Sequence, residues 1–277
     1  MLTRRTLLGT AAPALLRAAA LPRAGCQTNA WRITPGNFGE LLAVLDKIKG
    51  YGYQGFETGY RNVQGQFSNA AAARKEMEKR GLRFLGCHIF LLQYDPETLV
   101  APAGLIESVA GGAAALGAER LILSGASAGD GGQLKKKIRA LEAIGRRVKS
   151  HGLQLCYHNH DLEFRNSGHE IESMLSGADK LKLILDAGHA FRAGADIPAF
   201  LARHGARIDG MHLRDFENGE QVPLGKGNFN LAALAQAVRE QRWAGWIINE
   251  EERLNDIKPG DGAVTPARAA IKTAFGV

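Results

Sequence analysis

The stretch Leu153–Phe164 (LQLCYHNHDLEF) begins as a buried β-strand and ends in a run of ionisable side chains. Residues 153–157 are mostly apolar and β-prone, and the next six residues hold His158, His160, Asp161 and Glu163. Unpaired polar groups cost several kcal/mol to bury unless a partner or a metal ion satisfies them. The pattern therefore indicates a functional site at the end of a strand, although the stretch by itself is equally compatible with a solvated loop.

The same pattern recurs three times further along the chain. It appears in LKLILDAGH (181–189), ARIDGMHLRD (206–215) and GWIINEEE (245–252). Each segment passes from strand-like apolar residues into a side chain that can bind a metal. The recurrence favours one site shared by several strand ends over a set of unrelated loops.

Apolar patterns with periods near 2 and 3.6 residues divide the rest of the chain into strands and helices. We expect strands at 25–31, 53–58, 82–90, 119–124, 153–163, 181–186, 207–213 and 246–250. We expect helices at 38–49, 67–80, 97–116, 133–150, 170–175, 197–204, 230–241 and 265–275. This alternation implies parallel strands. Eight such units in about 250 residues predict a single-domain α/β fold, the (β/α)8 TIM barrel.

A doubly wound parallel sheet is the alternative fold. It would place a Gly-rich phosphate loop after an early strand, and no G-x-G-x-x-G motif follows one here. Gly225-Lys226-Gly227 comes late in the chain and is interpreted as a turn. The barrel is therefore the better prediction.

The composition is that of an ordinary globular chain of 277 residues, 45% hydrophobic and 23% charged. Cys26, Cys87 and Cys156 are too far apart for a CxxC metal motif and fit buried thiols. The net charge of +7 falls to +3 without the four arginines of residues 1–24. The basicity is mainly an N-terminal feature, so we expect no nucleic-acid partner.

Residues 1–24 have the features of an export signal. Thr3–Leu8 (TRRTLL) resembles a twin-arginine motif, and a short apolar segment, residues 7–16, follows it. That segment is shorter than the roughly 20 residues that span a bilayer as a helix. We expect a twin-arginine-type signal peptide at 1–24, a barrel at 25–277, and an exported, periplasmic mature protein without a membrane span. A disordered basic leader is the alternative.

Active sites of (β/α)8 barrels lie at the carboxyl ends of the strands, where the polar side chains of this chain gather. They are Glu57, His88, His158, His160, Glu163, Asp186, His212 and Glu250. One polar residue capping one strand would be ordinary, but the joint pattern predicts a site. Carboxylates and imidazoles without thiolates suit Mn²⁺, Mg²⁺, Co²⁺ or Zn²⁺.

The segments YHNHDLEF, LDAGH, HLRD, GKGNFN and GWIINEE closely resemble the xylose isomerase-like sugar phosphate isomerase/epimerase family, from about Gly25 to the C-terminus. The resemblance implies a TIM barrel with one divalent metal, for which Mn²⁺ is our first expectation. It assigns the metal ligands as Glu163, Asp186, His212 and Glu250. The run Glu250–Glu252 leaves the last ligand open by one residue. The family more often has Lys where Arg214 stands, and Arg offers a planar fork instead.

The resemblance also implies the chemistry, which is abstraction of a proton next to a substrate carbonyl. Its outcome is epimerisation, isomerisation or β-elimination. The candidate bases are His160, Glu163 and Glu250. The candidates for binding substrate or supporting the ligands are Glu57, His88, His158, His189 and Arg214, and structural roles stay open for the histidines among them.

We expect a metal-dependent sugar isomerase or epimerase, or a related lyase, that acts on a keto-sugar, keto-inositol or 3-keto-glycoside. An export signal favours a non-phosphorylated substrate. One alternative is an endonuclease IV-like metal nuclease on the same barrel, which would need a three-zinc cluster. The other is a non-catalytic sugar-binding protein. The sequence leaves open which sugar is bound and whether the chain forms a homo-oligomer.

Overall fold

Eight parallel strands close into a barrel in the computed structural model, which describes residues 21–252 and 258–277. The order around the barrel is β1-β10-β7-β6-β5-β4-β3-β2. The strands are β1 (Arg23–Gln27), β2 (Gly55–Gly59), β3 (Arg83–Ile89), β4 (Arg120–Leu123), β5 (Gln154–His158), β6 (Lys182–Asp186), β7 (Ile208–Leu213) and β10 (Trp246–Asn249). The expected single-domain TIM barrel is confirmed.

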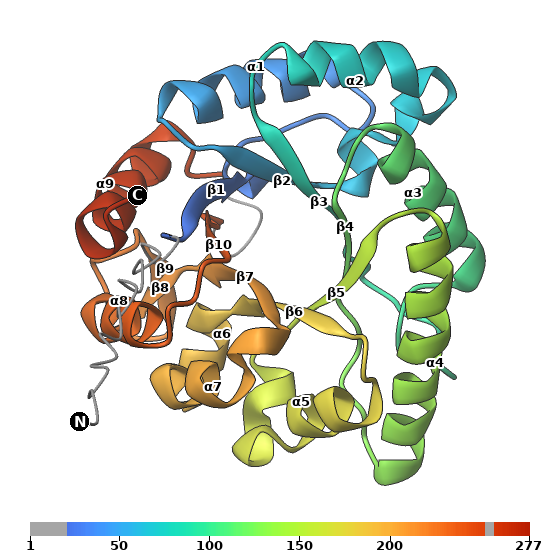
Figure 1. Ribbon diagram of the computed structural model, residues 1–277, viewed down its shortest axis with the longest axis vertical. Coiled ribbons are helices and arrows are strands. Elements are labelled where there is room, and N and C mark those ends of the chain that lie inside the picture. The colour runs from blue at the N-terminus through green and yellow to red at the C-terminus, as the bar shows by residue number, and fades with distance from the viewer. Residues whose placement is uncertain (1–20, 253–257) are drawn as a thin grey trace, which may run out of the picture.

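Helices form a ring around the outside of the strands (Figure 1). They are α1 (Phe38–Gly50), α2 (Ala70–Glu78), α3 (Ala103–Ala115), α4 (Gly131–Ser150), α5 (Arg165–Gly177), α6 (Ala187–Arg192), α7 (Ile197–His204), α8 (Leu231–Glu240) and α9 (Asp261–Phe275). Asn37, Asp130, Asp196 and Asn230 precede α1, α4, α7 and α8 and accept hydrogen bonds from their first-turn N–H groups. None of the described helices is both long and apolar enough to cross a membrane.

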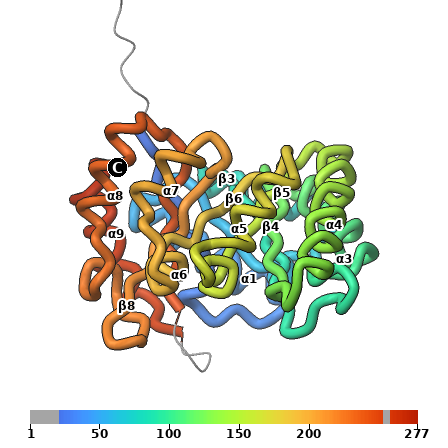
Figure 2. Tube along the Cα trace, turned by 90° about the horizontal axis from the view of Figure 1, so that it is seen from below, coloured from blue at the N-terminus to red at the C-terminus, as the bar shows by residue number. Residues whose placement is uncertain are grey.

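The loops contain short elements that the sequence did not predict. Strands β8 (Asp215–Glu217) and β9 (Glu220–Val222) form an antiparallel hairpin directly after β7. The hairpin lies at the lower edge of the barrel in Figure 2, and this edge is the carboxyl end of the strands. The 3-10 segments are η1 (Thr28–Ala30), η2 (Tyr60–Asn62), η3 (Gln64–Asn69), η4 (Leu162–Phe164) and η5 (Gly205–Arg207).

Several expected boundaries are corrected. The barrel starts at Arg23, not at residue 25, because Arg23 and Ala24 pair with Trp246 and Ile247 of β10. The expected signal at 1–24 therefore overlaps β1, and its residues 1–20 lie outside the described part of the chain. The strand expected at 153–163 ends at His158, and the helix expected from residue 97 begins at Ala103 after the extended Pro102.

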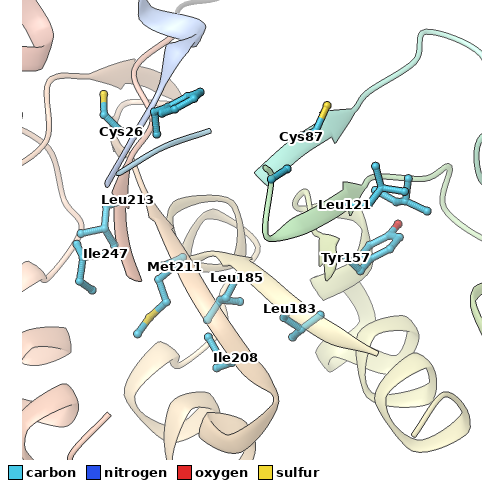
Figure 3. Packing of buried hydrophobic residues seen from close by; sticks show 14 of the residues in the cluster. Cys26, Cys87, Leu121, Tyr157, Leu183, Leu185, Ile208, Met211, Leu213 and Ile247 are labelled. Atoms are coloured by element: carbon cyan, nitrogen blue, oxygen red, sulfur yellow. The ribbon is translucent and has the colours of Figure 1, made fainter. Parts of the chain in front are cut away.

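Buried apolar side chains lie on both faces of the barrel wall. The larger group lies between strands and helices and includes Leu183 and Leu185 of β6 (Figure 3). The smaller group fills the barrel interior and comprises Leu85, Ile122, Cys156, Ile184, Trp246 and Ile248. Successive strand residues face opposite sides, so the outward Leu183 and Leu185 leave Ile184 and Asp186 facing inward. The three cysteines are free and buried, as expected.

A β-bulge decides which side chains of β3 face the interior. The pairing with β2 shifts between Phe56 and Glu57, whose partners are Phe84 and Gly86, so Leu85 is an extra residue. Leu85 packs in the interior group, whereas Cys87 packs outside. The extra residue restores an inward direction at His88, which would otherwise lie on the opposite face from Leu85.

Candidate metal centre

Four side chains converge inside the barrel at its carboxyl end. His158 ends β5, Asp186 ends β6, His212 lies on β7, and Glu250 follows β10. One ligand atom from each lies within 4.8 Å of the others, and all four residues are buried. Strand alternation explains the convergence, because the residues two positions earlier also face the interior. These are Cys156, Ile184, Gly210 and Ile248.

Glu163, which the sequence assigned as a ligand, is not in this group, and His158 takes its place. The strand ends at His158, and the η4 turn carries Glu163 to the outer face of the wall. There the carboxylate accepts hydrogen bonds from the Tyr157 hydroxyl (2.6 Å) and the His160 backbone N–H (2.9 Å). Tyr157 packs between strands and helices, so Glu163 lies across β5 from the four converging groups.

Glu163 belongs instead to a buried charged network outside the barrel. The Lys137 ammonium donates to the Tyr157 hydroxyl (2.8 Å), the Ala126 carbonyl (2.8 Å) and the Glu170 carboxylate (2.7 Å), and it lies 3.9 Å from Glu163. Burial raises the pKa of Glu163. A buried ammonium with this many acceptors is satisfied, and the network fixes the backbone that carries His160.

Other side chains orient the converging groups. Glu57 of β2 is fully buried and lies 2.7 Å from His212 Nε2, so the other ring nitrogen, Nδ1, faces the group. Carboxylates commonly orient metal-binding histidines in this way. Ser124 Oγ lies 3.1 Å from His88 Nε2 and 3.5 Å from His158 Nδ1. Glu57 therefore supports His212 and is not exposed to a substrate.

Asn159 of the YHNH segment holds β5 and β6 together beyond the end of β5. Its side chain accepts from the Asp186 backbone N–H (2.9 Å) and donates to the Asp186 carbonyl (3.1 Å). The amide thereby continues the pairing of β5 with β6 one residue beyond the strand. It fixes the backbone on which Asp186 is presented.

Arg214 lies over the group and pairs with its carboxylates. Its Nε is 2.7 Å from Asp186 Oδ2, its Nη2 is 2.5 Å from Glu250 Oε2, and its Nη1 is 3.0 Å from Glu252 Oε1. The neighbouring Glu251 accepts from the Leu224 backbone N–H and faces away from this group. The structure thus resolves the uncertain position at the end of β10, since Glu250 faces the interior.

Two glycines permit this close packing. A Cβ on Gly188 would lie 2.4 Å from Arg214 Cγ, so the LDAGH segment can hold only glycine at that point without a shift. A Cβ on Gly227 would lie 2.4 Å from Asp215 Oδ1. Asp215 accepts from the N–H groups of Phe216, Gly225, Gly227 and Phe229, so the Gly-Lys-Gly turn wraps an internal carboxylate.

Burial and neighbouring charges shift the pKa values of the site histidines in opposite directions. Burial lowers the pKa of His160 to about 3, with a contribution from His158. Burial also lowers the pKa of His189 to about 4. At His212, burial again acts to lower the pKa, but Glu250 and Glu57 outweigh it and raise the pKa to about 10. His160 is therefore neutral at pH 7, and His212 carries a proton while no metal is bound.

A divalent cation fits the donor set and the charge of this group. Asp186 Oδ2 is buried without a hydrogen-bond partner, although Arg214 Nε lies close to it. Asp186, Glu250 and Glu57 can bring three negative charges, and Arg214 brings one positive charge. A divalent ion bound with His212 deprotonated would make the whole buried set neutral. Carboxylate and imidazole donors suit Mn²⁺, Mg²⁺, Co²⁺ or Zn²⁺.

A cavity of about 810 Å³ opens onto the group. His158, Arg214 and Glu250 border its inner end, and His88 and His160 border its side. His189, expected to bind substrate, is not among the bordering residues; its ring packs 5.2 Å from that of His160. Among the described residues, no side chain hydrogen-bonds the His160 ring, so its nitrogens are available to a ligand.

The sequence did not single out the polar residues of the opposite wall, which are Gln27, Asn29, Tyr60 and Asn62. Asn29 donates to Glu250 Oε1 at 2.9 Å. Asn29 follows β1, and Tyr60 and Asn62 follow β2, so their place after early strands was the available signal. Neutral amides are common in loops, and they gave no reason to choose these over others.

A family model described as a xylose isomerase-like TIM barrel matches residues 45–274. An inosose dehydratase from Lacticaseibacillus casei is 27% identical over 134 residues, which cover 41% of this chain and 45% of that enzyme. An inosose dehydratase from Mesomycoplasma hyopneumoniae is 32% identical over 137 residues, which cover 42% of this chain and 46% of that enzyme. The chain thus matches less than half the length of these relatives.

Solved structures share the fold over nearly the whole chain. A 3-keto-D-glucoside 4-epimerase from E. coli has a TM-score of 0.71 and 14% identity, covering 92% of this chain and 100% of that chain. A D-allulose 3-epimerase from Methylomonas sp. has a TM-score of 0.71 and 15% identity, covering 92% of this chain and 99% of that chain. At these identities the likeness shows the fold alone.

Proposed function

The chain belongs to the xylose isomerase-like TIM-barrel family, and from this premise we propose that it is a divalent-metal-dependent enzyme acting next to the carbonyl of a non-phosphorylated keto-sugar. Keto-inositols and 3-keto-glycosides belong to the same proposed class. The observation that carries the proposal is the buried group of His158, Asp186, His212 and Glu250 at the inner end of a cavity large enough for a sugar. The activities of the similar proteins, a dehydratase and two epimerases, support this class of chemistry.

The bound metal would polarise the substrate carbonyl and lower the pKa of the neighbouring C–H bond. Arg214, whose guanidinium already faces Asp186 and Glu250, would place a fixed positive charge beside the oxygen on which negative charge develops. The amides of Asn29 and Asn62 would bind sugar hydroxyls on the cavity wall. These residues position the substrate, and a further group must accept the proton.

We assign proton transfer to Glu250 before His160. Both border the cavity, whereas Glu163 lies outside the barrel wall and has no access to it. Basicity does not separate the two, because both pKa values are lowered. Burial lowers the pKa of His160. At Glu250, burial acts to raise the pKa, but Arg214 and His212 outweigh it and hold the pKa well below its usual range. Glu250 is preferred because it belongs to the group that would hold the metal at the inner end of the cavity, beside the carbonyl that a bound metal would polarise. His160 would instead orient a substrate hydroxyl through its ring nitrogens, which have no hydrogen-bonding side chain among the residues that the structure describes.

Mn²⁺ is the metal we propose, because the donors are two carboxylates and two imidazoles without thiolate. Metal analysis of the purified chain should give about one ion per chain on the single-site expectation. Three zinc ions per chain, with cleavage of DNA at abasic sites, would favour the nuclease alternative instead.

The proposed activity is tested by following C–H exchange of keto-sugars, keto-inositols and 3-keto-glycosides in D₂O by NMR, with and without Mn²⁺. We expect metal-dependent incorporation of deuterium next to the carbonyl. Glu142→Gln, on the exposed face of α4, is a control that should exchange like wild type. Sugar binding without exchange on any substrate would leave the chain a binding protein and reject the enzyme.

We also propose that residues 1–20 direct twin-arginine export and that the mature protein acts in the periplasm. The motivation is TRRTLL followed by a short apolar segment. A chain that begins at Leu21 keeps all of β1 and should fold. Cell fractionation should find the full chain in the periplasm and an Arg4→Lys, Arg5→Lys variant in the cytoplasm; equal distribution of the two would reject the export signal.

A further inference from the structure

Two exposed apolar side chains stand at the mouth of the cavity. Among the described residues, the large hydrophobic side chains that are exposed are Leu21, Phe90, Leu92 and Leu162. Phe90 and Leu92 both follow β3 and both border the cavity that holds the candidate metal centre. Their exposed fractions are 51% and 90%. Apolar side chains that gather at a binding site, unlike scattered ones, indicate a ligand surface.

A series of ring contacts connects this apolar lip, Phe90 and Leu92, to the metal centre. The His158 and His160 rings are 5.3 Å apart between centroids, and the His160 and Phe90 rings are 5.7 Å apart. Phe90 is therefore two ring contacts away from His158, which belongs to the candidate metal centre. The lip is thus close enough to the metal centre to contact a group bonded to a sugar that reacts there.

The walls of the cavity differ in character. Near the metal centre the wall carries the amides of Gln27, Asn29 and Asn62, which match the hydroxyls of a sugar ring. At the mouth, Phe90 and Leu92 form an apolar stretch of the wall. The charged side chains of Arg61 and Lys258 border the same cavity. The volume of about 810 Å³ lies in the upper part of the range for pockets that hold drug-sized ligands, which are larger than a single sugar ring.

We propose that the substrate is a glycoside whose aglycone is aromatic or otherwise apolar, and that this aglycone packs on Phe90 and Leu92 while the sugar ring occupies the polar inner part. The inference rests on the proposed function for the placement of the sugar. A free sugar would leave the lip in water, whereas an apolar aglycone would cover it. The lip is thus a second subsite that selects the group attached to the sugar.

The test compares binding of phenyl and methyl D-glucosides, both anomers of each, to the full chain with Mn²⁺ by titration calorimetry. We expect wild type to bind one phenyl glucoside at least tenfold more tightly than its methyl counterpart. A Phe90→Ser, Leu92→Ser variant should lose about tenfold for the phenyl glucoside and little for the methyl one. Leu162→Ser, another exposed apolar side chain that does not border this cavity, is the matched control and should bind like wild type.

Equal affinity of wild type for both glucosides would overturn the subsite. So would a lip variant that keeps the phenyl preference. If light scattering shows a dimer that the lip variant alone loses, the lip is a contact between copies of the chain and the proposal fails. Exchange of keto-sugars without a phenyl preference rejects the subsite but keeps the proposed function, whereas a phenyl preference without any exchange does the reverse.

Discussion

The two ends of the barrel both hold buried charges, yet they treat them differently. At the amino end, Arg120 is paired with Asp209 (2.5 Å) and Glu119 (3.0 Å) and donates to the Leu85 carbonyl (3.1 Å). The guanidinium of Arg23 lies 4.2 Å from the ring centre of Trp246 and covers it. The charged groups at this end have partners within the protein.

At the carboxyl end, buried polar atoms are left without hydrogen bonds. Glu57 Oε1 is buried and has no hydrogen-bond partner, and Asp186 Oδ2 and Arg214 Nε lie 2.7 Å apart as an ion pair without a hydrogen bond. Buried polar groups are nearly always satisfied in folded proteins, so such exceptions require an explanation. The difference indicates that the charged groups at the amino end contribute to stability, whereas those at the carboxyl end can bind a ligand. Active sites of (β/α)8 barrels generally lie at the carboxyl end.

The largest expected effect lies at the carboxyl end and concerns rate. Glu250→Gln should reduce C–H exchange by on the order of 10²–10⁴, because it removes the proposed base. It should also weaken Mn²⁺ binding. His160→Gln should keep the metal and lose less rate, since that imidazole only orients the substrate in our proposal. The measurement is deuterium incorporation together with metal content. If His160→Gln incorporates deuterium more slowly than Glu250→Gln, His160 is the base and Glu250 is not.

The second largest expected effect is the stabilisation of the folded chain by Mn²⁺, which also depends on the carboxyl end of the barrel. Mn²⁺ at 100 times its dissociation constant should stabilise the folded chain by about 2.7 kcal/mol, because it binds only the assembled group. Asp186→Asn should abolish this stabilisation, and it should also lower the melting temperature in chelator, because the buried Asp186 carboxylate pairs with Arg214 at 2.7 Å. Thermal unfolding with Mn²⁺ and with chelator gives both values. A stabilisation that survives in Asp186→Asn would place the metal elsewhere.

The sequence was sufficient for the barrel and for three residues of the candidate centre. Asp186 ends β6, His212 lies one residue before the end of β7, and Glu250 directly follows β10, so strand alternation is consistent with their inward direction. Glu163 was assigned as a ligand by the resemblance of the YHNHDLEF segment to the family, and the structure leaves it outside the four converging groups. The strand ends at His158, and Glu163 lies in the turn that follows, on the outer face, where it contacts Tyr157 and the sequence-distant Lys137.

Other features depend on geometry that a single sequence does not display. The extra residue Leu85 in β3 leaves the apolar pattern looking regular, yet it reverses the direction of every later side chain in that strand. The β8–β9 hairpin has strands of three residues, which are too short for a periodic signal. Arg214 was recognised as a departure from the family pattern, but its pairing with Asp186 and Glu250 needed the folded chain.

At the amino end the expected effect is on stability and not on rate. Asp209→Ala removes the closest partner of the buried Arg120, and we expect a loss of about 2 kcal/mol of unfolding free energy, which is below the value for a fully buried pair because Glu119 remains. Exchange rate per folded molecule should not change. Denaturant unfolding and the exchange assay measure the two effects. An Arg120→Met, Asp209→Leu double variant should recover part of the stability, and a rate defect in Asp209→Ala would contradict the division between the ends.

The smallest expected effect tests whether position at the carboxyl end is itself enough to make a charge functional. Asp261, after β10, pairs with Lys47 at 2.8 Å and accepts a hydrogen bond from Trp31 at 2.8 Å, but both charged side chains are about half exposed. The hydrogen bond from Lys47, followed by that from Trp31, lowers the pKa of Asp261. A carboxylate whose pKa is lower in the folded state stabilises the fold above its unfolded pKa of 3.8 and loses that contribution as the pH falls through the folded value.

Wild type should therefore lose about 0.5 kcal/mol more stability between pH 6 and pH 3 than Asp261→Asn, a small difference because solvent screens an exposed pair. Denaturant unfolding at several pH values measures it. Lys47→Met should reduce the dependence less than Asp261→Asn does, because the hydrogen bond from Trp31 remains, and the double variant should behave like Asp261→Asn. Exchange activity should stay at the wild-type level in all three. An unchanged acid dependence in Asp261→Asn would remove this pair from the stability of the rim, and a loss of activity would mean that exposed, fully paired charges at this end also serve the site.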